Sequence, residues 1–255
     1  MKKTFLILGV GLLILIVAFV IALGFYIGPI VKLGMLQIGP KITQVSIKVD
    51  AVDISLLTGS AQVKGLIVGN PEGFKMPQAI SVGTVALSVD PLSVLSGKIL
   101  VRSLHVESPE ITFEGGFGSN NLSQIMDNVN TFSKNVVPAS SNYSSGSNNK
   151  PAPKIEVDDL LITGAQVHVR LTGLVSKAMT VTLPQIHLTG LGKDSNGLTP
   201  AQLTSAVLSA IDSSTIKAVT ASVTQLGQGV EILGKGAGKA VGSTVNSILN
   251  SIGGL

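Results

Sequence analysis

The sequence predicts a mainly β protein with flanking helices (α+β), built on a curved antiparallel sheet of repeated strand-corner-strand units, with an N-terminal transmembrane helix and C-terminal helices. Three observations lead to this prediction. Residues 5–27 carry no charge and are almost entirely apolar or Gly. Further along, apolar and polar residues alternate over short stretches, which is typical of half-buried strands. Part of this β-like region also recurs 38 residues later.

Residues 5–27 are the first element, and they are long enough to cross the ~30 Å hydrocarbon core of a bilayer as a helix. Lys2 and Lys3 precede them. The positive-inside bias therefore places residues 1–4 in the cytoplasm and the body of the chain outside. A cleaved signal peptide is the alternative, but its apolar region would span only about 7–15 residues. We therefore expect a retained single-pass anchor.

The end of the anchor is rich in Gly and Pro. Residues 28–40 begin with Gly28-Pro29 and end with Gly39-Pro40, which predicts a hinge. Gly24 and Gly28 have the spacing of a helix-packing motif, although chance recurrence explains it better than dimerisation.

Residues 41–136 contain the repeat and a short helix. Leu57-Thr58-Gly59 in the first copy matches Leu95-Ser96-Gly97 in the second. Each triplet predicts a corner with a buried leucine, followed by a glycine at a position where positive φ is useful.

The strand after each corner shows the same irregularity. Its apolar phase slips by one residue between Val63 and Leu66, and again between Val101 and Leu104. A slip at equivalent places predicts a β-bulge that bends the sheet.

The rest of the chain divides into three parts. Residues 119–132 read as an amphipathic helix with Asn120 as its N-cap. Residues 137–153 are a linker rich in Ser, Asn and Pro, and residues 154–212 hold a second β region and an amphipathic helix capped by Thr199. Residues 213–255 are a Gly-rich tail, for which a packed or membrane-surface helix and a mobile segment are equally consistent interpretations.

No residue pattern in the sequence predicts a catalytic site. The chain has no Cys, and its net charge of +4 includes the two lysines before the anchor, so disulfides, thiolate chemistry and nucleic-acid binding are not expected. The histidines and clustered glutamates fall on the polar phase of predicted strands, which favours solvent-facing roles. These residues are His105, His168, His187, Glu107, Glu110 and Glu114. We therefore expect no enzyme activity, no metal and no cofactor.

The apolar face of the predicted sheet is the candidate binding surface. An open groove on this face would suit an acyl chain, which gains ~0.8 kcal/mol per buried CH₂. The alternative is that the same residues pack against the helices as an ordinary core. The candidate groove residues are Val63, Leu66, Val68, Leu87, Val101, Leu104 and Val106.

Several steps of the sequence resemble AsmA-like proteins. Asn70-Pro71-Glu72-Gly73-Phe74 is similar to a strand-ending step of that family, and Gly118-Ser119-Asn120-Asn121-Leu122 is similar to its step into a helix. The segments around the second corner also follow the family's order.

The resemblance implies an inner-membrane anchor, a body in the periplasm and a role in outer-membrane biogenesis and lipid homeostasis. It makes phospholipid and other envelope proteins the candidate partners. A structural or protein-interaction module with a fully packed core is the alternative function.

Overall fold

The computed structural model describes residues 26–116, 119–136, 154–171 and 179–233. The predicted anchor up to residue 25, the linker at residues 137–153 and the tail beyond residue 233 lie outside the described residues. Within the described ranges, no helix is both long and apolar enough to span a membrane.

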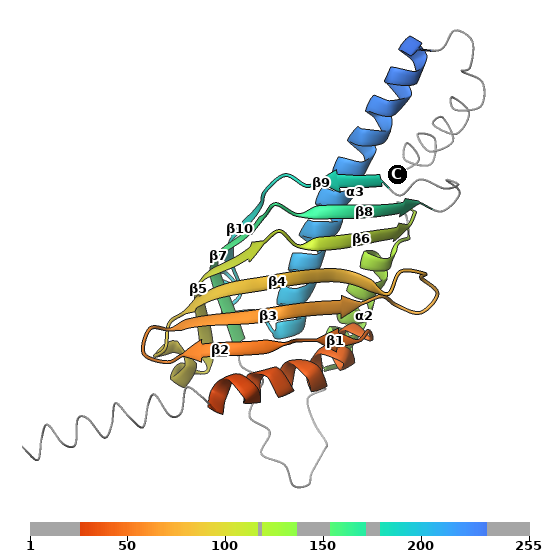
Figure 1. Cartoon of the computed structure of the whole chain (residues 1–255). Helices are drawn as coiled ribbons and strands as arrows, with labels where there is room; N and C mark the ends of the chain where they lie inside the picture. Colours follow the sequence, from red (N-terminus) through yellow and green to blue (C-terminus); the bar gives the residue numbers. More distant parts are fainter. Residues whose placement is uncertain (1–25, 117–118, 137–153, 172–178, 234–255) are drawn as a thin grey trace, which may run out of the picture.

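The described strands form one ten-stranded sheet, curled into a half-barrel with helices on its inner side (Figure 1). The strands are β1 (Ile47–Lys48), β2 (Ala51–Ser55), β3 (Ser60–Gly69), β4 (Gln78–Val89), β5 (Lys98–Glu107), β6 (Glu110–Gly115), β7 (Lys154–Thr163), β8 (Gln166–Leu171), β9 (Met179–Thr182) and β10 (Ile186–Leu191). The helices are a segment over residues 26–43, the 3₁₀-helix η1 (Ser93–Ser96), α2 (Asn121–Val136) and α3 (Pro200–Leu233). The predicted mainly β fold with helices is confirmed.

The prediction of a wholly antiparallel sheet is wrong at two pairs. The hairpins of the repeat are antiparallel, as expected, but β5 pairs with β7 and β6 with β8 in parallel. Between β6 and β7 the chain passes through α2, and a connection of this kind allows a strand to return parallel to an earlier one.

A crease across the sheet produces its curl. Three pairs of consecutive strands, β5 and β6, β7 and β8, and β9 and β10, each follow one another across a short bend. The bends are at Ser108-Pro109, Gly164-Ala165 and Leu183-Pro184. Ser108 N donates to Thr163 O over 2.8 Å, and Leu183 N donates to Ala165 O over 2.9 Å, so the three bends are joined. Ser108 and Gly164 have φ of 48° and 64°, which turns the backbone out of the strand direction. One strand of each pair therefore lies on one side of the bend, in the order β5, β7 and β10, and the other lies on the opposite side, in the order β6, β8 and β9.

The predicted hinge at residues 28–40 is wrong, because residues 26–43 form a continuous helix. This helix lies along β1 and β2 (Figure 1). Lys32 Nζ donates to Asp50 O over 2.6 Å, and Ile42 is buried in the core. Packing against the sheet edge outweighs the weak helix propensity of Gly and Pro.

Both predicted helix N-caps are confirmed. Asn120 Oδ1 accepts from Ser123 N over 2.9 Å at the start of α2. Thr199 Oγ1 accepts from Gln202 N over 3.2 Å at the start of α3, and Gln202 Oε1 accepts from Thr199 N in return. The helix that follows Thr199 is longer than expected: α3 continues to Leu233, so the first part of the predicted tail is helical.

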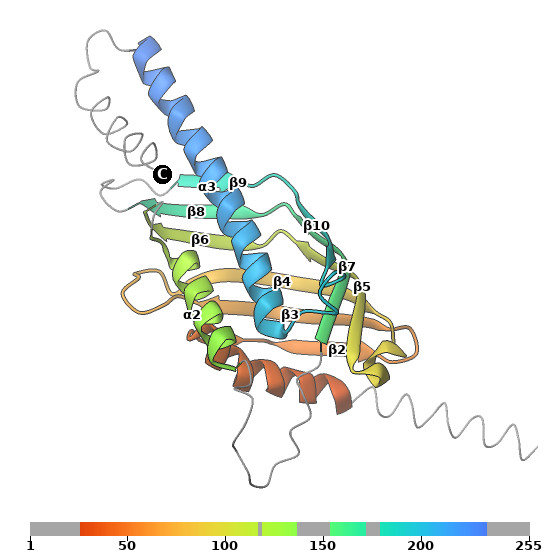
Figure 2. The same ribbon diagram turned by 180° about the vertical axis from the view of Figure 1, so that it is seen from behind.

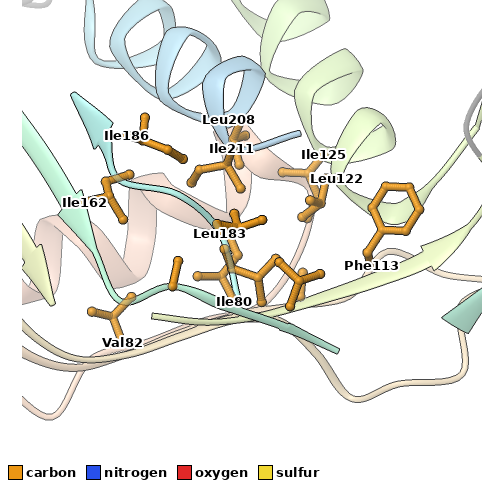
Figure 3. Close-up of a cluster of buried hydrophobic side chains, with 14 of the residues drawn as sticks. Ile80, Val82, Phe113, Leu122, Ile125, Ile162, Leu183, Ile186, Leu208 and Ile211 are labelled. Carbon is orange, nitrogen blue, oxygen red and sulfur yellow. The ribbon is translucent and has the colours of Figure 1, made fainter. Parts of the chain in front are cut away.

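The core lies between the sheet and the two long helices, α2 and α3 (Figure 2). Leu122 and Ile125 of α2 lie near Ile80 and Phe113 of the sheet (Figure 3). Leu208 and Ile211 of α3 lie near Ile186 and Leu183, at the other end of the same cluster (Figure 3).

Candidate functional site

The inner face of the sheet carries unbroken apolar rows that run across the strands. Residues in register on β3, β4, β5, β7 and β10 form two of them. The first row is Val63, Val85, Val106, Ile162 and Ile186, and the second is Ala61, Leu87, Leu104, Leu160 and Leu188. Because side chains alternate between the two faces of a strand, each row presents a continuous apolar surface to the inside.

Helices cover one half of these rows more closely than the other. α3 packs on β7, β9, β10 and α2. Under it, Leu160 is 0% exposed and Ile162 is 2% exposed. On β3, β4 and β5 the members of the same rows are only half-buried at several positions, including Val63, Leu87 and Leu104. The inner face therefore changes from a filled core to a partly open surface along each row.

The seven candidate groove residues divide accordingly. Val101 is 5% exposed and belongs to the filled core, so its prediction as a groove residue is wrong. The others are half-buried and pack at the edge of the core: Val63, Leu66, Val68, Leu87, Leu104 and Val106. We call these six residues the open strip. It is a shallow apolar surface continuous with the core.

The corners match the prediction in their backbone but not in their side chains. Gly59 and Gly97 have φ of 70° and 81°, as the Leu-x-Gly pattern predicts. Leu57, however, is 61% exposed, so the expectation of a buried corner leucine is wrong. The side chain of Leu95 lies outside the described part of the structure.

The bulge predicted after each corner is found in one copy. Ser88 pairs with Ser103 and Val89 pairs with Val101, which leaves Arg102 as the extra residue. In the first copy, Gly65 has φ of 60° at the predicted place, but the register shift falls later, between Val68 and Gly69.

Gly28 serves a packing role within the chain. A Cβ at this position would lie 2.1 Å from Val52 O on β2, so only glycine allows the helix to lie this close to the strand. Gly24, the other half of the predicted helix-packing pair, lies outside the described residues.

Sequence reasoning missed a buried polar cluster around Glu114. The residue is 9% exposed, and its carboxylate accepts from the backbone N of Lys75 and of Met76 over 2.9 Å each. Asn121 donates to Asn70 Oδ1 over 2.7 Å and accepts from Glu114 N. The prediction that Glu114 lies on a solvent-facing polar surface is therefore wrong. Glu114 fastens the loop after β3 to the start of α2, and the Asn-Pro and Asn-Asn steps of the family pattern were the available signal.

The three histidines each form an isolated pair with one carboxylate on the surface. His168 Nε2 lies 2.6 Å from Glu110 Oε2, and His187 Nε2 lies 2.5 Å from Asp159 Oδ1. His105 lies 3.8 Å from Glu107. Over the described ranges, no three His, Cys, Asp or Glu residues gather as metal ligands would.

Two carboxyl groups in the described ranges have shifted pKa values. Burial raises the pKa of Asp212 on α3 above its ordinary value, although the neighbouring Asn120 side chain opposes the rise. The hydrogen bond from Arg102 lowers the pKa of Asp90, with help from the backbone N of Leu92. The two groups are on different elements and do not form an acid/base pair.

Comparison with known proteins adds one finding. No curated protein and no solved structure matches the chain. The family model of the AsmA family matches residues 1–188, which include the first nine strands, α2 and the start of β10. This match covers well over half of the 255 residues and includes the motifs that carry the resemblance. The chain belongs to the AsmA family.

Proposed function

We propose that this chain is a non-catalytic periplasmic protein, anchored in the inner membrane by residues 5–27, that acts in the lipid homeostasis of the cell envelope by holding acyl chains on the open strip. Membership of the AsmA family indicates a role in the envelope related to the outer membrane. The anchor, the lipid ligand and the absence of catalysis are the parts that we propose beyond this.

The half-buried state of the open strip is the observation that carries the proposal. Val63, Leu87 and Leu104 continue rows whose members on β7 are buried under α3, yet they keep part of their own surface accessible. Four methylenes buried on such a surface would contribute about 3 kcal/mol without any directional contact. An aliphatic chain fits this requirement because it needs no hydrogen-bond partner.

A structural or interaction module is the second candidate function. The observation that favours it is the filled half of the same face, where Val101, Leu160 and Ile162 are core residues. In this case the open strip would be only the margin of the core, and no lipid would bind to it.

Lipid analysis of a matched pair of variants tests the proposal. The full chain would be purified from membranes in mild detergent, and its bound lipid would be measured by mass spectrometry. Leu104→Glu places a charge on the open strip, whereas Ala86→Glu places one at an exposed position on a neighbouring strand. We expect bound phospholipid to fall about tenfold in Leu104→Glu and to stay unchanged in Ala86→Glu.

The proposal fails if the well-folded wild-type chain carries no more phospholipid than the Leu104→Glu variant. Circular dichroism of each variant checks that the sheet is intact. Equal loss of lipid in both variants would indicate a general effect of charge instead of a site on the strip.

A further inference from the structure

We propose that the end of the sheet formed by the two repeat corners docks on the surface of the membrane that holds the anchor. We call this end the corner tip, and its apolar residues are Leu57, Leu92 and Val94. The inference rests on the proposed anchor and adds a second, peripheral contact with the same bilayer.

The corner tip exposes large apolar side chains at the point where two corners meet. Leu57, Leu92 and Val94 are 61%, 77% and 53% exposed. The corners touch each other, because Val89 N donates to Gly59 O over 2.7 Å and a Cβ at Gly59 would lie 3.1 Å from Pro91 Cδ. Clustered exposed apolar residues at one end of a domain mark a contact surface.

The start of the described chain lies at the same end. Gly28 packs on Val52 and Lys32 on Asp50, so the helix over residues 26–43 begins toward the corner end of β2. Figures 1 and 2 agree that its first turn lies beside η1 and the turn between β2 and β3. Tyr26 and Ile30 of this helix are 71% and 65% exposed. The uncharged run that precedes Tyr26 in the sequence therefore joins the body at the corner tip.

The charges behind the tip suit a bilayer with anionic lipid. Lys98 and Lys154 lie side by side at the starts of β5 and β7. Lys98 pairs with Glu156 over 2.6 Å, whereas Lys154 is exposed and has no carboxylate partner within the described ranges. Lys193 is exposed next to Asp194, on the turn between β10 and α3. This turn lies against the start of β7, because Leu198 N donates to Ile155 O. A Lys near an anionic surface contributes about 1 kcal/mol, and inserted apolar side chains add to it.

Site-specific fluorescence on the full chain tests the docking. The chain has no Cys, so Leu57→Cys and Leu92→Cys each give a single labelling site for the NBD fluorophore. Glu72→Cys is the matched control, because Glu72 is exposed in the loop between β3 and β4, at the other end of these strands. The labelled chains would be reconstituted in vesicles of phosphatidylethanolamine and phosphatidylglycerol. We expect lipids with a nitroxide near the headgroup to quench NBD about twofold at positions 57 and 92 and hardly at position 72.

A further label separates this inference from the proposed anchor. Leu13→Cys lies in the apolar run, and quenching there by deep nitroxides would support the anchor. Quenching at position 13 with none at 57 and 92 would overturn the docking and leave the anchor standing. No quenching at position 13 would overturn both. A blue shift at 57 and 92 that grows with protein density, without quenching by lipid, would show that a second copy covers the tip and would also overturn the inference.

Discussion

The two copies of the repeat share a pattern but close their corners differently. In the first copy, Ser55 pairs directly with Ser60 across a tight corner. In the second copy, η1 fills the corner and Gly97 ends it. Ser93 holds this wider corner, because its Oγ donates to Asp90 O and accepts from Leu100 N.

This difference separates what the shared residues determine from what their neighbours determine. The glycine of each Leu-x-Gly triplet provides the positive φ in both copies. The width of the corner depends on the residues before it, since Asp90 starts a turn in the second copy by accepting from Leu92 N. The tight corner packs against its neighbour, whereas the wide corner is open at its glycine.

The largest expected change in the free energy of unfolding comes from substituting the two corner glycines. A Cβ at Gly59 would lie 2.1 Å from Val89 O, whereas a Cβ at Gly97 meets nothing within 4 Å. We expect Gly97→Ala to lower the free energy of unfolding by about 1–2 kcal/mol, from the positive φ alone. Gly59→Ala should cost about 3 kcal/mol or more, because the clash adds to the same strain. Urea unfolding of the full chain in detergent measures both, and equal losses would contradict the proposed difference between the corners.

A smaller change in the free energy of unfolding is expected when the equivalent valines of the two copies are replaced by alanine. Val101 is 5% exposed, whereas Val63 is half-buried on the open strip. We expect Val101→Ala to cost about 2 kcal/mol and Val63→Ala about 1 kcal/mol, since the cost follows the apolar surface removed from the core. The same unfolding measurement applies. A larger loss at Val63 would mean that the open strip is as well packed as the core.

The smallest effect concerns the ion pair between Arg102 and Asp90 at the second corner. Arg102 Nη2 lies 2.6 Å from Asp90 Oδ2, and this hydrogen bond lowers the pKa of the carboxyl below its ordinary value of 3.8. A lowered pKa stabilises the folded state above pH 3.8, and this contribution is lost as the pH falls through the folded pKa. We expect Arg102→Gln to raise the pKa of Asp90 in an NMR titration. An unchanged pKa would assign the shift to the backbone N–H groups instead.

The sequence was sufficient for features that depend on local chemistry. The caps at Asn120 and Thr199, the positive φ at Gly59 and Gly97 and the strands of the repeat follow from the preferences of single residues and from short periods. The family could also be recognised, because the order of its motifs is a property of the chain itself.

The missed features depend on contacts between distant segments. Glu114 receives N–H groups from Lys75 and Met76, about 40 residues earlier in the chain, and no local pattern marks a carboxylate for burial. Residues 26–43 form a helix despite their Gly and Pro content, because contacts with the edge of the sheet stabilise it. Val63 and Val101 occupy equivalent places in the repeat, but Val101 lies on β5 between β4 and β7, whereas Val63 lies on β3, next to the margin strand β2.

The helix along β1 and β2 has a consequence for how the sheet can grow. An uncovered edge strand is a template on which another chain can add a strand. Here Gly28 lies against the carbonyl of Val52 and Lys32 occupies that of Asp50, so this side of the template is blocked. Among the described strands, the bent margin made by β9 and β10 is the other end of the sheet. In the part of the chain that the structure describes, a strand that extends the sheet therefore cannot add along β2 and must add elsewhere.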